Sequence, residues 1–239
     1  MWVSILLSLA PGIALGAFIL AASPVLAEYG LDSVFALFGG IGLVIVPLEL
    51  GWLSVVGRRT SGSWSPFAAV SYTTKLPPRR LVLLGLGLAV WFILTLVLWM
   101  TLVESKVVDA LSPWVPQTIL QFAQTGAQGG LPPTGLIVAL LIIAFVLNGM
   151  LGPVTEELYF RGYLLARIDR FGVWAPALNS ILFALYHVWT PWRWPQIAFG
   201  FMPLAVAAWR TRSLYVSMTA HVTINIVFLV LLSASFLSG

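Results

Sequence analysis

The sequence alternates between long apolar runs and short polar segments. Four of the apolar runs are each near the ~20 residues that a chain needs to cross the hydrocarbon core of a bilayer as a helix. These runs lie at residues 3–22, 34–56, 81–103 and 134–155. The fourth run continues as a predicted helical stretch through residue 167. The pattern therefore predicts membrane-spanning helices.

Three further apolar runs follow, at residues 173–189, 197–209 and 213–236, and the middle one is short. No repeat of the solenoid or transporter type is present, and no long polar domain is expected at either end. The sequence thus predicts an all-α, polytopic membrane helix bundle of about seven (six to eight) transmembrane helices. We expect one membrane domain over residues 1–239.

The composition agrees with this class. The chain is 60% hydrophobic and 8% charged, whereas soluble domains carry roughly a quarter charged residues. This excludes a cytosolic enzyme, a disordered regulator and a nucleic-acid-binding protein. Because the chain has no cysteine, disulfides, thiolate metal sites and a cysteine nucleophile are excluded as well.

The distribution of charge predicts the orientation in the membrane. Residues 57–80 hold five basic residues and no acid, while residues 23–33 hold two acids and no base. Since basic loops are retained in the cytoplasm, we expect the N-terminus and the 57–80 loop to be cytoplasmic and the 104–133 loop to be outside. In the second half of the chain, the same topology places Arg167, Arg170, Arg210 and Arg212 on the cytoplasmic side and Arg193 on the outer side.

The first apolar run has a second interpretation. Val25, Leu26 and Ala27 resemble a signal-peptidase site at the end of the run. However, a basic segment before the run is missing, and the run is longer than the core of most signal peptides. A membrane helix is the favoured interpretation, and a cleaved signal is the alternative.

The polar residues inside the apolar runs are the strongest functional signal. A charge at the bilayer centre costs at least ~2.5–3.5 kcal/mol, and such residues usually mark function. Counted from the basic turns at ~1.5 Å per helical residue, they lie at similar depths, so three helices can bring them together. They are Glu156, Glu157, Arg161, His187, His221 and Asn225.

Their spacing suggests roles. Glu157 and Arg161 are four residues apart, so they can form an ion pair on one helix face, and Glu156 points about 100° away, toward the histidines. Asn179, Phe183 and His187 form one stripe at helical spacing, and His221 with Asn225 forms another. Taken singly, each group could instead be an anchoring salt bridge or a hydrogen bond between helices. Glu49, another acid in an apolar run, is predicted to lie near the cytoplasmic boundary or to form a structural pair rather than to take part in catalysis.

Such a set can activate water against a peptide carbonyl. A carboxylate serves as general base, an imidazole orients the water, and Asn and His donors stabilise an oxyanion. A set of two His and one Glu can alternatively hold a catalytic zinc ion. The motifs His-Glu-x-x-His, Gly-x-Ser-x-Gly and Gly-x-Gly-Asp, typical of other proteases, are absent from the sequence.

Three motifs carry a family resemblance. The sequence contains Glu156-Glu157-x-x-x-Arg161, then Phe183-x-x-x-His187, then His221-x-x-x-Asn225. In this order they resemble the CPBP family, also called the Abi domain, which comprises CAAX prenyl endoproteases of the Ras-converting type and bacteriocin-processing relatives. The resemblance covers residues 150–230, which we expect to form the catalytic core.

The resemblance implies an intramembrane endopeptidase similar to CAAX prenyl protease 2. By position, Glu156 and His187 would activate water, His221 and Asn225 would hold the oxyanion, and Glu157 and Arg161 would support Glu156. Phe183 would line the substrate cavity. Both a metal-free glutamate mechanism and a zinc mechanism are argued for the family, and a zinc ion would use Glu156, His187 and His221. Asn225 favours the metal-free alternative, because an amide suits an oxyanion donor better than a zinc ligand.

The implied partners are the lipid bilayer and a membrane-associated peptide or prenylated CAAX protein, cleaved near its C-terminus. Two other functions remain open for the same residues. A non-catalytic immunity or scaffold protein could keep the fold, and a small transporter or proton relay could use membrane Glu and His residues.

Overall fold

The structure is a computed structural model that describes residues 2–123 and 134–238. Within these residues every regular element is a helix, and the only bridge between extended segments in them joins Thr73 to Ser213. The prediction of an all-α membrane bundle is confirmed. The last ten residues of the predicted 104–133 loop, 124–133, lie outside the described residues.

The first half of the chain forms three long helices with short helices at the ends of the bundle. Its elements are α1 (Trp2–Ala27), α2 (Ser33–Gly40), the π-helical η1 (Ile41–Ile45), α3 (Val46–Ser61), η2 (Pro66–Ala69), α4 (Pro78–Leu102), α5 (Glu104–Leu111), α6 (Gln117–Leu120) and η3 (Gln121–Ala123).

The second half is more broken. Its elements are α7 (Thr134–Ala144), the π-helical η4 (Phe145–Leu151), α8 (Gly152–Glu157), the π-helical η5 (Leu158–Leu164), α9 (Leu165–Arg167), η6 (Asp169–Trp174), α10 (Ala175–Tyr186), η7 (Pro191–Arg193), α11 (Trp194–Thr211) and α12 (Leu214–Ser238).

Five helical stretches of the described chain are long and apolar enough to cross a membrane. They are Ser4–Ala27, Ser33–Ser61, Pro78–Leu102, Gly135–Arg167 and Leu214–Ala234. The other two predicted runs form α10 and α11, which are shorter or less apolar. The predicted run at 134–155 and its continuation to 167 form one stretch, in which α7, η4, α8, η5 and α9 follow one another without a loop.

Two of the π-helical segments have a visible cause. Proline lacks the N–H of a helical hydrogen bond, and its ring clashes with the preceding turn. Just before Pro153, the Gly152 N–H bonds to the carbonyl of Leu147, five residues back instead of four. The same widened turn precedes Pro47, in η1. Insertion of one residue in the turn lets each helix continue past its proline, and such π-bulges are frequent at functional sites.

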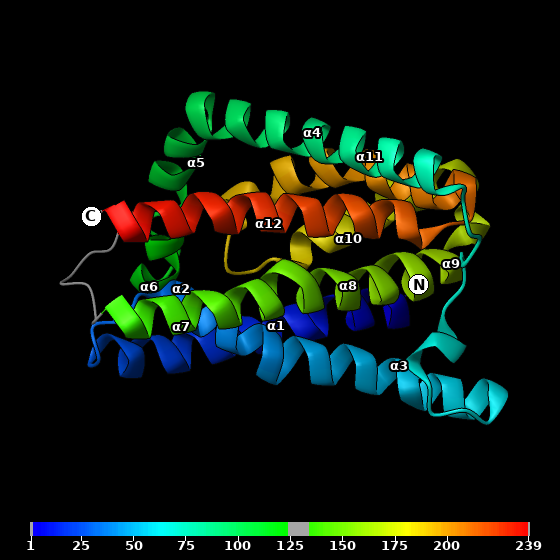
Figure 1. Ribbon diagram of the computed structural model, residues 1–239, viewed down its shortest axis with the longest axis horizontal. Coiled ribbons are helices and arrows are strands. Elements are labelled where there is room, and N and C mark those ends of the chain that lie inside the picture. Colours follow the sequence, from blue (N-terminus) through cyan, green and yellow to red (C-terminus); the bar gives the residue numbers. More distant parts are fainter. Residues whose placement is uncertain (1, 124–133, 239) are drawn as a thin grey trace.

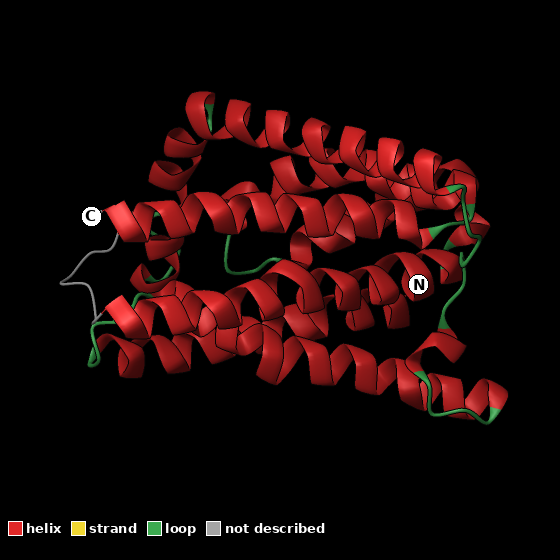
Figure 2. Cartoon of the chain, viewed as in Figure 1, coloured by secondary structure: helices red, strands yellow, loops and turns green. Residues whose placement is uncertain are grey.

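The helices lie roughly parallel along the long axis of the molecule (Figure 1). α10 packs between α1 and α11, and α12 packs against α4, α8 and α11. Loops lie mostly at the two ends, but the connection after α10 lies inside the length of the bundle (Figure 2). A helix that ends inside the bundle brings irregular backbone and polar groups into its interior.

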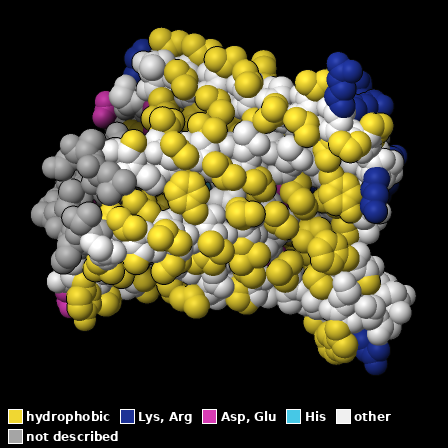
Figure 3. Space-filling view, viewed as in Figure 1, with side chains coloured by type: hydrophobic (Ala, Val, Ile, Leu, Met, Phe, Trp, Pro, Cys, Tyr) yellow, Lys and Arg dark blue, Asp and Glu magenta, His cyan; other side chains and the backbone are white. Residues whose placement is uncertain are grey.

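The two ends of the molecule differ in charge. Most of the Lys and Arg side chains on the visible face gather where α3 ends and α4 begins, with a broad apolar surface along the helices between the ends (Figure 3). At the opposite end, Arg193 makes a two-pronged ion pair with Glu104, with a shortest distance of 2.7 Å. Arg193 therefore lies at the same end of the bundle as Glu104, the first residue of the predicted 104–133 loop.

A polar cluster joins two connections at the basic end. Arg212, in the left-handed conformation with φ 51°, donates to Asp169 at 2.8 Å and to the Tyr72 hydroxyl at 2.7 Å. The Trp209 indole also donates to Asp169. The hydrogen bond from Arg212 is the main cause that lowers the pKa of Asp169 below its ordinary value. The cluster ties the segment before α4 to the turn between α11 and α12.

Candidate active site

The two adjacent acids end α8 and point to different partners. Glu157 is completely buried and Glu156 nearly so, at 0% and 7% exposure. Glu157 pairs with Arg161 at 3.2 Å, and both side chains have no exposed surface. This is the ion pair that the spacing predicted, and it lies in the interior of the bundle rather than at an interface of the membrane.

His221, on α12, lies between the two acids. Its Nδ1 is 3.0 Å from Oε1 of Glu157, and its Nε2 is 3.7 Å from Oε2 of Glu156. Because Glu157 is also paired with Arg161, its carboxylate is well suited to accept a hydrogen bond from Nδ1. That bond fixes the imidazole and directs Nε2 toward Glu156, the arrangement by which a carboxylate orients a catalytic histidine.

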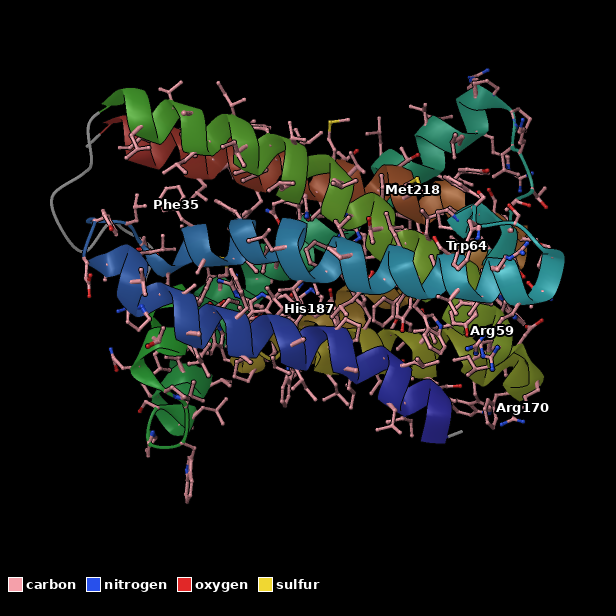
Figure 4. The ribbon with its side chains drawn as sticks, turned by 90° about the horizontal axis from the view of Figure 1, so that it is seen from below. Phe35, Arg59, Trp64, Arg170, His187 and Met218 are labelled. Carbon is pink, nitrogen blue, oxygen red and sulfur yellow. The ribbon has the colours of Figure 1, made fainter. Side chains whose placement is uncertain are left out.

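His187 lies at the C-terminal end of α10, where the helix stops. Its Nδ1 is 2.8 Å from the carbonyl oxygen of Phe183, one turn back. A carbonyl can only accept, so Nδ1 carries the proton and Nε2 is the acceptor nitrogen of the neutral ring. His221 and Arg161 are close enough to interact electrostatically with His187. Figure 4 shows His187 midway between the end marked by Phe35 and the end marked by Arg59 and Arg170.

Phe183 occupies the centre of the cluster. Its ring centroid lies 4.2 Å from the Arg161 guanidinium carbon, 4.7 Å from the His187 ring and 5.8 Å from the His221 ring. Phe201, from α11, covers His221 at 4.8 Å. Phe183 is completely buried in this structure, so the lining of a substrate cavity stays a prediction for it. What the ring does here is stack on the guanidinium and separate it from lipid.

Asn225 lies one turn beyond His221 on α12, and its amide is held by a neighbouring helix. Its Nδ2 donates to the carbonyl of Asn148 at 2.8 Å. That carbonyl lacks a partner in its own helix, because the widened turn of η4 would pair it with residue 153, which is a proline. The amide keeps a second hydrogen that this bond does not use. Asn225 therefore makes its described hydrogen bond to backbone and not to the Glu–His cluster.

Asn179 does not take part in the cluster either. The predicted stripe placed it on the same face as Phe183 and His187. Its Nδ2 instead donates to the Phe160 carbonyl at 3.0 Å, and that carbonyl also accepts the Leu165 N–H in the widened turn of η5. Asn179 thus joins α10 to the helix that carries the acids.

Two further groups lie beside Glu156: Tyr186, which the sequence analysis did not single out, and Glu49, for which it did not predict a place in the site. The Tyr186 hydroxyl donates to Oε1 of Glu156 at 3.1 Å. Glu49, on α3, has 0% exposure and interacts with Glu156 and with Tyr186. Its position in an apolar run was the available signal, but nothing in the sequence shows that its helix passes beside α10.

The close approach of α1 positions the end of α10. A Cβ added at Gly12 would lie 2.0 Å from the carbonyl oxygen of Tyr186, and one at Gly16 would lie 2.6 Å from Val188. Only glycine allows the α1 backbone to approach the residues on both sides of His187 so closely. The Tyr159 hydroxyl adds a hydrogen bond of 2.8 Å to the Leu7 carbonyl.

The fit of a metal ion can be tested on these contacts. Across residues 2–123 and 134–238, no three His, Asp or Glu side chains gather in a way that could hold one ion. The Nδ1 hydrogen bonds of His221 and His187 would not prevent the two Nε2 atoms from binding a metal ion, but Glu156 and the two rings are not gathered around one point. The zinc set predicted as an alternative, Glu156, His187 and His221, is therefore not assembled as a ligand shell in this arrangement.

These features define a class of protein: a helical membrane protein with a buried cluster of two carboxylates, two imidazoles and a guanidinium inside its bundle. Residues 138–227 match the model of the family described as type II CAAX prenyl endopeptidase Rce1-like. This match covers all three motifs and supports their resemblance to the CAAX-type intramembrane proteases. Searches of curated proteins and of solved structures give no match.

Proposed function

We propose that the protein is an intramembrane endopeptidase that hydrolyses a peptide bond near the C-terminus of membrane-associated substrates, with prenylated CAAX proteins as the first class to test. The observation that carries this proposal is the contact of His221 with both Glu156 and Glu157 inside the bundle. The family match over the same residues supports it.

Glu156 is the proposed general base. A water molecule beside the Glu156–His221 pair can hydrogen bond to both groups at once, since their nearest atoms are 3.7 Å apart. The acceptor Nε2 of His187 is available to orient the same water. Transfer of the water proton to Glu156 produces the nucleophile for the peptide carbonyl, and the proton then passes to the leaving amine.

His221 and Asn225 are the proposed oxyanion donors. Asn225 has a free amide hydrogen, and its bond to the Asn148 carbonyl fixes the direction of the amide. His221 already uses Nδ1 toward Glu157, so donation from Nε2 requires the protonated ring. Preorganised donors of this kind are worth about 10²–10³-fold in rate each.

Glu157 and Arg161 are the proposed support of the site. With Arg161 and a protonated His221 the cluster has two positive charges, which balance the two carboxylates of Glu156 and Glu157. Buried charges at membrane depth are tolerated when they are paired in this way. Phe183 covers the guanidinium and completes the desolvated environment.

The metal-free mechanism is the one that we propose. It uses each contact described above, whereas Glu156, His187 and His221 would have to move closer together to hold one zinc ion. When bound, zinc would polarise the carbonyl or the attacking water, with Glu156, His187 and His221 as its ligands. Metal analysis of the purified protein and the effect of a chelator on turnover distinguish the two.

The test is turnover of a quenched farnesylated CAAX peptide, and of a library of membrane peptides, by purified protein in detergent or liposomes. We expect Glu156→Ala and His187→Ala to lower kcat by at least ~10²-fold, as loss of a general base does. Glu28→Ala is the matched control, because Glu28 is exposed. Equal turnover by wild type and the site variants would overturn the assignment and favour a non-catalytic role.

A further inference from the structure

Glu49 is a buried acid that the proposed mechanism leaves without a role. It lies on α3, two residues after the proline that follows η1, and has 0% exposure. Neither of its carboxyl oxygens makes a protein hydrogen bond of ordinary geometry. An acid at membrane depth with so little compensation is costly, so its retention needs a physical reason.

The surroundings of Glu49 point to the active site. The polar side chain that interacts with it is Tyr186, whose hydroxyl donates to Glu156 at 3.1 Å. Glu49 also interacts electrostatically with Glu156 and with Tyr159. No described Lys, Arg or His contributes to the interactions of Glu49, whereas Glu156 has His221 and Arg161 nearby.

These contacts decide which carboxyl carries the charge. Two neighbouring buried carboxyl groups cannot both ionise at low cost. Glu156 has cationic neighbours and Glu49 has none, so the charge belongs on Glu156 and Glu49 is expected to be a neutral acid. A neutral carboxyl group has one O–H donor. The nearby acceptor for that donor is the hydroxyl oxygen of Tyr186. The hydrogen of the same hydroxyl is donated in a hydrogen bond to Glu156.

We propose that Glu49 is a positioning residue, whose neutral carboxyl donates to Tyr186 and so holds the Tyr186 hydroxyl directed at Glu156. The inference rests on the proposed function, because its effect is exerted on the proposed base. A small movement of the carboxyl of Glu49 toward Tyr186 completes the chain Glu49–Tyr186–Glu156. Hydrogen bonds in such a chain polarise and strengthen one another.

The experiment compares Glu49→Leu, Glu49→Gln, Tyr186→Phe and the double variant Glu49→Leu/Tyr186→Phe, using the farnesylated CAAX peptide as probe. We expect Glu49→Leu and Tyr186→Phe each to lower kcat by about tenfold at nearly constant KM, as loss of a hydrogen bond to a charged group does. The double variant should be no slower than Tyr186→Phe. Glu49→Gln should stay within about threefold of wild type, because its amide also donates.

Several results would overturn the inference. Additive losses in the double variant would show that Glu49 does not act through Tyr186, and a Glu49→Gln variant as slow as Glu49→Leu would show that donation is not its role. Ser54→Ala is the control for α3, because the Ser54 hydroxyl bonds only to the carbonyl of Leu50 in its own helix. If Glu49→Leu turned over substrate at the wild-type rate while Glu156→Ala was inactive, the inference about Glu49 would be refuted and the proposed function would stand.

A second measurement does not depend on turnover or on the folding of Glu49→Leu. A neutral buried carboxylic acid gives an infrared carbonyl band that is absent for an ionised carboxylate. We expect this band in wild-type protein near neutral pH and its loss in Glu49→Gln. A band unchanged by the substitution, or missing from the wild type, would contradict the proposal even if no substrate were turned over.

Discussion

Glu156 and Glu157 are adjacent in sequence but have different partners, and this difference is the residue-scale basis of the site. Glu157 is held by Arg161 and by Nδ1 of His221, whereas Glu156 receives the Tyr186 hydroxyl and faces Nε2 of His221. Consecutive residues on a helix point about 100° apart. One acid can therefore stabilise the imidazole while the other is directed at the reacting water.

The buried pair of Glu157 and Arg161 predicts a large effect on stability. We expect Arg161→Leu to lower the free energy of unfolding by about 3–5 kcal/mol, because it removes the guanidinium that pairs with a fully buried acid. Thermal unfolding in detergent should show this as a clear fall in Tm. The double variant Glu157→Gln/Arg161→Leu should be more stable than Arg161→Leu alone, and a double variant that is less stable would contradict the pairing.

The Asp169–Arg212 pair predicts a pH dependence. The pKa of Asp169 is lowered from 3.8, first by its hydrogen bond from Arg212. A lowered folded pKa gives stability that is present above pH 3.8 and is lost as the pH falls through the folded value. The Tm of Asp169→Asn should thus lie below that of wild type at neutral pH, and the difference should vanish in strong acid. A difference in Tm between wild type and Asp169→Asn that grows as the pH falls would contradict this prediction.

At the scale of elements, the shape of the site depends on helices that depart from regularity. α10 ends at His187 inside the bundle, and the π-helical turn before Pro153 exposes the Asn148 carbonyl that Asn225 binds. Glycines on α1 allow it to contact the end of α10. These departures place two polar groups, His187 and the Asn148 carbonyl, inside the bundle.

The contact between α1 and α10 can be tested with one methyl group. Gly12→Ala should destabilise the protein by about 1–3 kcal/mol, as overpacking does, and should lower turnover because the backbone beside His187 must move. Gly39→Ala is the matched control, since no atom lies within 4 Å of the added Cβ. Equal Tm and turnover for the two variants would mean that α1 does not hold α10 in place.

At the scale of the whole molecule, the two ends of the bundle differ in charge. Arg58 and Arg59 end α3, and Arg79 and Arg80 begin α4, so the connection between these helices forms the basic end, near the start of α1 (Figure 1). The Glu104–Arg193 pair marks the opposite end. From the positive-inside rule we predict that the basic end is cytoplasmic.

Because the chain has no cysteine, this orientation can be measured directly. Ser63→Cys introduces a thiol at the basic end and Ser112→Cys at the other, both at exposed positions. In intact cells a membrane-impermeant maleimide should label Ser112→Cys, and should label Ser63→Cys only after lysis. The reverse pattern would invert the predicted topology.

The sequence by itself determined the helical membrane class, the approximate spans and the ion pair of Glu157 with Arg161. The length of an apolar run and the i, i+4 spacing of two residues are local properties, so they do not depend on how the helices pack. A proline such as Pro153 disturbs the hydrogen bonding of the helical turn before it, but the sequence does not show which carbonyl is left without its partner.

Only the tertiary structure decided that His221 contacts both acids, that Tyr186 donates to Glu156, and that Glu49 lies beside them. Each of these contacts joins residues more than 29 positions apart, on helices whose rotation and mutual approach follow from packing. In an apolar run, most positions are equally hydrophobic, so the sequence does not encode which face of the helix is turned inward. The position of Glu49 beside Tyr186 and Glu156 is a consequence of how the bundle closes.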